Sequence, residues 1–100
     1  MHARVARFEG ANADAIRRSA EQINADASSG PPEGVPAVGF MMLIDPDSGR
    51  GLGISLFDSE DDMRTGDEVL NEMNPPGEGM GRRTSVEMYE VAVDVRLGSQ

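Results

Sequence analysis

The sequence has no cysteine, no tryptophan and no lysine, and aromatic residues make up only 4 % of its 100 residues. The absence of cysteine excludes disulfides, thiolate catalysis and thiolate metal sites. A hydrophobic share of 38 % with so few aromatics predicts a thin core. Seven methionines compensate in part, because the flexible methionine side chain fills irregular gaps. A chain of this length is enough for one domain, and we expect residues 1–100 to form a single domain.

Long apolar runs and basic clusters are also missing. No run approaches the roughly 18 apolar residues that span a bilayer, and the basic N-terminus lacks the apolar stretch of a secretory signal. Eighteen acidic residues against nine arginines give a net charge of −9, which is unfavourable for binding phosphate backbones or anionic membranes. We therefore expect a cytoplasmic protein that binds neither nucleic acid nor membranes. Solubility explains the excess of acidic residues. The alternative is an acidic face that binds a basic partner.

The middle of the chain contains a β-hairpin signal. Two apolar runs, at 37–44 and 52–57, flank a cluster of turn residues. Either Gly49 or Gly51 can take the positive φ that such a turn requires. The first run does not alternate with polar residues, which predicts that both faces of that strand are covered. The second run does alternate, so that its large side chains fall on one face.

Two segments show helical periodicity, each behind a candidate cap. Asn12 is a candidate N-cap for the first helix, and Ser59 with Asp62 resembles a capping box for the second. The first apolar stripe contains Ile16, Ala20, Ile23 and Ala27. The second contains Met63, Gly66, Leu70 and Met73. Prolines and glycines then predict loops at 28–36 and 74–83.

Further strands are expected at 2–9 and, as one long strand, at 84–97. The resulting order is strand, helix, strand, strand, helix, strand. Two right-handed crossovers around a hairpin predict an α+β, ferredoxin-like βαββαβ fold. Its four-stranded antiparallel sheet would carry both helices on one face.

This arrangement leaves the other face of the sheet without cover. We expect that face to carry apolar side chains from 40–44 and valines of the last strand, and such a patch is unusual on a monomer. The last strand also exceeds the usual five or six residues and has the length to reach another subunit. The sequence therefore predicts a two-fold homodimer that packs sheet against sheet. The alternative is a small patch with a frayed tail.

Two stretches resemble a known family. Residues 43–62, which include Ser-Gly-Arg-Gly-Leu-Gly-Ile-Ser-Leu-Phe-Asp-Ser-Glu-Asp-Asp, and residues 85–91, Ser-Val-Glu-Met-Tyr-Glu-Val, are similar to the dimeric α/β-barrel superfamily. Within it they resemble uncharacterised proteins near the antibiotic biosynthesis monooxygenases. The resemblance implies two ferredoxin-like subunits whose sheets form a shared barrel, with a pocket between helices and sheet in each.

In relatives with known activity, that pocket binds aromatic or polycyclic substrates, which are oxidised without metal or flavin, or it binds haem. The resemblance therefore implies a monooxygenase or isomerase that needs no cofactor and acts on a hydrophobic aromatic-type substrate. The alternative is a non-catalytic dimer that binds a small ligand or acts in a stress response. The quinone-forming monooxygenases and the haem degraders of this superfamily each use a tryptophan in the pocket, and this chain has none. Neither predicted helix contains a histidine that could serve as an axial haem ligand.

Few side chains are candidates for chemistry. His2 is the only histidine, with an unperturbed pKa near neutrality, and it shares a strand face with Arg4. Tyr89 is the only tyrosine and can hydrogen-bond a ligand oxygen. We name His2 and Tyr89 as candidate catalytic residues, and Arg4, Met63 and Leu70 as candidate substrate-binding residues. The alternatives are a surface histidine, a packing tyrosine and arginines held in salt bridges.

No metal site is predicted. Residues 45–49 resemble the start of a calcium loop but lack its later ligands, and the consecutive acids at 60–62 are explained by the helix dipole. The 74–83 loop can act as a lid over a pocket. A cavity holding two of His2, Arg4 and Tyr89 would favour an enzyme. A cleft filled by the methionines and leucine of the second helix would favour a binding protein.

Overall fold

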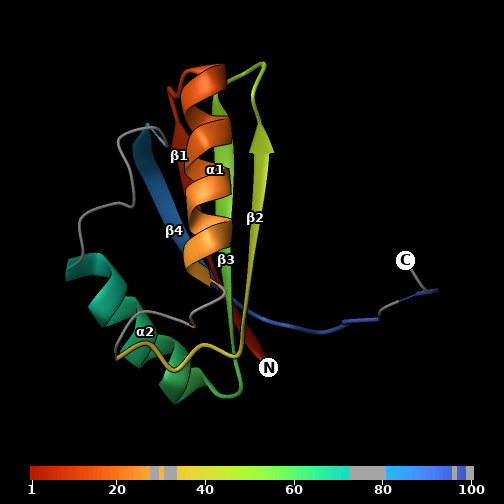
Figure 1. Cartoon of the computed structure of the whole chain (residues 1–100). Coiled ribbons are helices and arrows are strands. Elements are labelled where there is room, and N and C mark those ends of the chain that lie inside the picture. The colour runs from red at the N-terminus through yellow and green to blue at the C-terminus, as the bar shows by residue number, and fades with distance from the viewer. Residues whose placement is uncertain (28–29, 31–33, 73–80, 96, 99–100) are drawn as a thin grey trace.

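The structure, a computed structural model, describes residues 1–27, 30, 34–72, 81–95 and 97–98. Its elements follow the predicted order: β1 (His2–Glu9), α1 (Ala13–Ala27), β2 (Gly39–Asp45), β3 (Arg50–Phe57), α2 (Glu60–Glu72) and β4 (Arg82–Glu90). The strands form one antiparallel sheet in the order β2-β3-β1-β4. Both helices lie on the same side of it, α1 along the sheet and α2 across one end (Figure 1). The predicted ferredoxin-like fold is confirmed.

Both helices begin at the predicted caps. Oδ1 of Asn12 accepts hydrogen bonds from the backbone N–H groups of Asp14 and Ala15, at 2.9 and 3.2 Å. Oγ of Ser59 accepts one from the N–H of Asp62 at 3.1 Å. These bonds satisfy donors that the first turn of a helix leaves without an intrahelical acceptor. The residues predicted to end α2 lie outside the described part of the chain.

The hairpin turn depends on Gly49. This residue has φ of 72°, and its N–H donates to the carbonyl of Asp45 at 2.9 Å. Its own carbonyl accepts from the N–H of Ala11 at 3.0 Å, which ties the turn to the start of α1. A Cβ at this position would overlap the carbonyl oxygen of Ala11, so only glycine fits. Of the two glycines predicted for the positive φ, Gly49 is the one that adopts it.

The buried core consists of two clusters on the helix-covered face. One lies beneath α1 and contains Ala6, Phe8 and Ile16. The other lies beneath α2 and contains Val35, Phe57 and Met63. The register of the sheet then assigns the remaining strand residues to the two faces by alternation.

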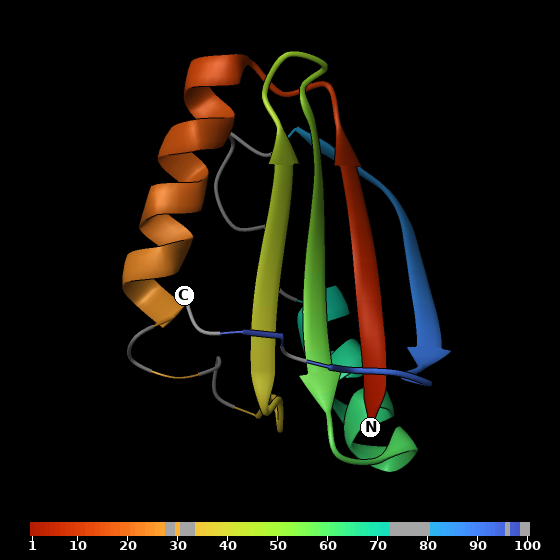
Figure 2. The same cartoon turned by 90° about the vertical axis from the view of Figure 1, so that its right-hand side faces the viewer.

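The opposite face, which we call the open face, has no described helix over it (Figure 2). By register it carries the large side chains of the two hairpin strands, namely Met41, Leu43, Leu52, Ile54 and Leu56. Met41 and Leu43 are exposed, and so is Phe40 on the other side of β2. In the single chain β2 therefore exposes side chains on both faces, and the prediction that both faces are covered depends on the second copy and stays a prediction.

The C-terminal strand is shorter than predicted, and one strand over 84–97 is wrong. Glu90 pairs with His2, the first residue of β1, and after the bond from Val91 N–H to the carbonyl of Met1 at 2.9 Å the described chain provides no further neighbour. Without a neighbouring strand the ladder cannot continue. Residues 91–95 leave the sheet as an irregular segment on the side away from α2 (Figures 1 and 2).

The strand also begins earlier than predicted, because Arg82 and Arg83 pair with β1. They were expected in the 74–83 loop. Most of that loop, with its proposed role as a lid, lies outside the described residues, as does Met73.

Candidate functional site

On the helix-covered face of the sheet, the two central strands, β3 and β1, carry mainly short side chains. One row across the four strands contains Phe40, Ser55, Arg4 and Met88, and the next contains Met42, Gly53, Ala6 and Val86. We call these two rows the sheet floor. Its central strands contribute mainly short side chains, whereas its edge strands contribute large apolar ones. Phe40 and Met88, at the two edges, are 49 % and 46 % exposed.

Packing over the floor is loose at Gly53 and tight beneath α2. A Cβ added at Gly53 would lie 3.9 Å from Cε2 of Phe8 and 4.0 Å from Cε1 of Phe40, both ordinary contacts. A Cβ added at Gly66 of α2 would lie only 2.5 Å from Cε1 of Phe57. Alternation along β3 explains the low floor, since its glycines and serine face the helices and its leucines and isoleucine face away. A Cβ is therefore tolerated at Gly53 and not at Gly66.

Arg4 is the charged residue of the floor and is only 4 % exposed. Its Nε donates to Oδ1 of Asp67 at 2.7 Å, and its NH2 group donates to Oδ1 of Asn71 at 3.1 Å. Both partners belong to α2, so the ion pair attaches this helix to β1 and compensates the buried cation. Arg7 likewise pairs with Glu87, so both arginines of β1 form salt bridges within the single chain.

The remaining candidates are not all brought together. His2 is on the same face as Arg4, two residues away along β1, and is partly buried. Met63 is buried in the cluster beneath α2, and Leu70 packs against that cluster. Tyr89 is opposite Ala3 in the register and therefore lies on the open face. Within one chain, His2 and Arg4 share a face that Tyr89 does not reach.

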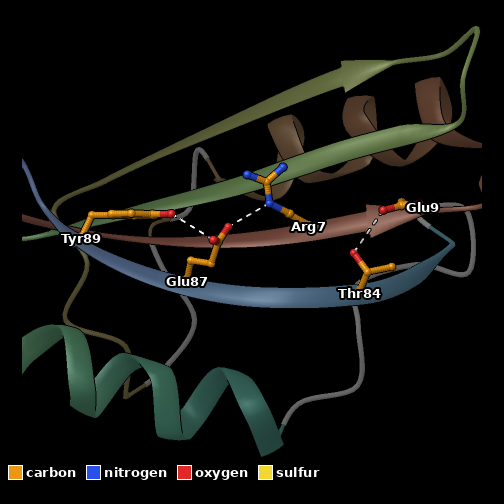
Figure 3. A network of polar contacts seen from close by, with 5 residues as sticks. All are labelled: Arg7, Glu9, Thr84, Glu87 and Tyr89. Atoms are coloured by element: carbon orange, nitrogen blue, oxygen red, sulfur yellow. Dashed lines mark hydrogen bonds and ion pairs between the residues drawn. The ribbon is translucent and has the colours of Figure 1, made fainter.

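On the open face, Tyr89 belongs to a polar network that the sequence did not reveal (Figure 3). Its hydroxyl donates to Oε2 of Glu87 at 3.0 Å, and Nε of Arg7 donates to Oε1 of the same carboxylate at 2.9 Å. The bond from Arg7, followed by that from Tyr89, lowers the pKa of Glu87 from its ordinary value. The bond to Glu87 raises the pKa of Tyr89. The alternation of β4 was the available signal, since it places 87 and 89 on one face.

Among the described residues, no group of three or more histidine, cysteine or acidic side chains is arranged to hold a metal ion. In the same part of the chain, neither helix has the length and hydropathy to cross a membrane.

Compared by sequence, the chain matches no family model and no curated protein. Its fold does match solved structures. One is the haem degrader MhuD of Mycobacterium tuberculosis with two haems bound in its active site; at 17 % identity the match covers 96 % of this chain and 100 % of that one, with a TM-score of 0.58. A mutant of MhuD with two manganese protoporphyrin IX molecules per active site matches at 17 % identity, over 95 % and 97 % of the two chains, with a TM-score of 0.56.

A third match is a candidate antibiotic biosynthesis monooxygenase from Deinococcus radiodurans. It is 12 % identical, and the match covers 99 % of this chain and 100 % of that one with a TM-score of 0.55. At these identities the likeness concerns the fold, and it confirms the subunit fold that the sequence resemblance implied.

The residues of this chain do not reproduce a haem site with an axial ligand on a helix. Neither α1 nor α2 contains a histidine, cysteine or tyrosine, and the one methionine of α2, Met63, is buried in the core. The only histidine of the chain is at the start of β1.

Proposed function

We propose that this chain, which has the subunit fold of the dimeric α/β barrels, forms a cytoplasmic homodimer that binds a small, flat, hydrophobic molecule of aromatic type on the sheet floor and oxidises it without a cofactor. The observation that carries the proposal is the floor itself, with its short central side chains and its exposed Phe40 and Met88. Ligand sites are largely apolar surfaces with a few polar groups, and aromatic and methionine side chains stack well on planar rings.

His2 is the proposed base, because it is the imidazole on the same face as the floor. It would remove a proton from an acidic CH2 group of the substrate. The carbanion then reduces O2: one oxygen atom is retained as a carbonyl, and the other leaves as water. The substrate supplies all the electrons, so the balance needs no further reductant. Arg4 would contact the substrate from the floor, and Met63 and Leu70 would form the packed wall beneath α2.

The homodimer is supported by the apolar surface that the described part of the single chain leaves exposed. The exposed Met41 and Leu43 of the open face and the exposed Val93 and Val95 of the C-terminal segment supply apolar surface for such an interface.

A second candidate function is ligand binding without turnover. Two observations favour it: Arg4 is already engaged by Asp67 and Asn71, and Tyr89 lies on the face opposite to His2. A bound ligand would then meet few polar groups able to move protons.

Titration with a fluorescent polycyclic phenol tests the binding site, and oxygen uptake with a polycyclic ketone that carries an acidic CH2 group tests the reaction. Gly53→Leu would fill the floor and should weaken binding at least about tenfold. Thr65→Leu, which adds the same side chain at an exposed position of α2, is the matched control and should bind as the wild type. Equal binding by both variants would contradict the proposed site. His2→Ala should still bind but consume no oxygen; binding without oxygen uptake by the wild type would instead support the second candidate.

A further inference from the structure

The open face is the neutral side of a strongly acidic molecule. Register places on it equal numbers of the two signs, namely Arg7, Arg50, Arg82, Glu9, Asp45 and Glu87. Helix α2, on the other side of the sheet, has six acidic residues and a single arginine. Two copies of a chain with net charge −9 repel each other least where their surfaces are neutral. Charge therefore favours the open face as the surface on which a second copy docks.

The polar network of Arg7, Glu87 and Tyr89 lies in the same rows as the apolar side chains of this face. Tyr89 is in the row of Leu56, Glu87 in the row of Ile54, and Arg7 opposite Leu52. The side chains of Arg7 and Glu87 are still 50 % and 39 % exposed in the single chain. A partner that covers these rows across β3, β1 and β4 would therefore also cover the network.

We propose that the Arg7–Glu87–Tyr89 network is buried in the homodimer interface and sets the register in which the two open faces meet. The inference rests on the homodimer of the proposed function. The bonds of the network are already formed within one chain, at 2.9 and 3.0 Å, so it enters the interface as a paired group (Figure 3). Burying a paired and hydrogen-bonded charge costs far less than burying a lone one.

Two-fold symmetry brings the network into the interface twice. If the two open faces met in any other register, apolar side chains of one copy would lie against the charges of the other. Those charges would then stay partly exposed. A polar group within an apolar interface selects one arrangement in this way, as a single buried asparagine does in coiled coils. The network thus contributes specificity, while the apolar rows contribute most of the association free energy.

The test is the dissociation constant of the homodimer, measured by sedimentation on the full chain. Arg7→Met and Glu87→Leu each leave one charge of the pair without its partner, and each should weaken dimerisation at least about 30-fold. The double variant removes both charges and should dimerise within about threefold of the wild type, or more tightly. The milder Glu87→Gln keeps a hydrogen-bond acceptor for Tyr89 and should fall between the wild type and Glu87→Leu. Circular dichroism checks that each variant keeps its sheet.

The matched controls are Arg64→Met and Glu60→Leu. These residues form an ion pair at 3.1 Å on α2 with both side chains largely exposed, and their loss should leave the dissociation constant unchanged. A dimeric wild type with unaffected Arg7 and Glu87 variants would overturn this inference alone. The inference would also be overturned if the double variant weakened dimerisation by as much as the two single variants combined. A monomeric wild type would overturn the homodimer and this inference together.

Discussion

Arg4 of β1 and Asp67 of α2 form an ion pair of 2.7 Å between Nε and Oδ1, with side chains only 5 % and 19 % exposed. The two residues are 63 positions apart in the chain. The pair attaches α2 to a central strand of the sheet, beside the packed contact between Gly66 and Phe57. The position of α2 over one end of the sheet floor depends on these two contacts.

Removal of the carboxylate tests the first contact. Asp67→Asn leaves the buried guanidinium of Arg4 without its counter-charge and should lower the free energy of unfolding by about 2–3 kcal/mol. Urea unfolding at one fixed protein concentration measures it, since dimerisation would otherwise shift the midpoint. Glu60→Gln removes an exposed pair as the control and should cost no more than about 0.5 kcal/mol. Equal losses in the two variants would contradict a structural role for the Arg4–Asp67 pair.

Addition of one methyl group tests the second contact. Gly66→Ala places a Cβ 2.5 Å from Cε1 and 2.7 Å from Cζ of Phe57, a ring that is fully buried. Overpacking of this kind costs about 1–3 kcal/mol, which should exceed the gain of about 1 kcal/mol from the higher helix propensity of alanine. The variant should therefore unfold at lower urea concentration than the wild type. A more stable Gly66→Ala would show that Phe57 can move away without loss.

Acid titration tests the pair between Arg7 and Glu87. Because Arg7 lowers the pKa of Glu87 in the folded protein, the pair stabilises the fold above the ordinary pKa of 4.5 and ceases to do so as pH falls through the lower folded value. Glu87→Gln should therefore be less stable than the wild type at neutral pH, with a difference that disappears below the folded pKa. Thermal unfolding followed against pH measures the difference. A difference that stays constant over this range would exclude the pair as its cause.

The single tyrosine gives a direct spectroscopic test of the same network. The hydrogen bond to Glu87 raises the pKa of Tyr89 above 10.0, and tyrosinate absorbance follows the ionisation of this one residue. In Glu87→Gln the pKa should fall back toward 10.0, because the charged acceptor is gone. Asp45→Asn, on the distant hairpin, is the control and should leave the titration of Tyr89 unchanged. An unaltered curve in Glu87→Gln would show that the bond is absent in solution.

Local signals in the sequence predicted much of the fold. The caps at Asn12 and Ser59 and a positive φ at either Gly49 or Gly51 were predictable, because each depends on residues within a few positions of it. Which side chains of a strand share a face was predictable from the two-residue period of a strand. The homodimer and the roles of the candidate residues stay predictions.

Contacts between distant segments were not predictable. Strand β4 ends at Glu90 because β1 begins at His2, a limit set by pairing and not by the valines that follow. The partner of Arg4 is one of eighteen acidic residues, and no local pattern distinguishes Asp67 from the others.

The sequence by itself determined the order of the strands and helices and which side chains of a strand share a face, since these depend on spacing and on nearby hydrogen bonds. Only the tertiary structure decided how the alternation of one strand aligns with that of the next. The pairing of Ala3 with Tyr89 places the tyrosine on the open face, whereas Arg4, one residue along, faces the helices. A shift of one residue in that pairing would reverse the two faces of β4, and nothing within either strand encodes the register.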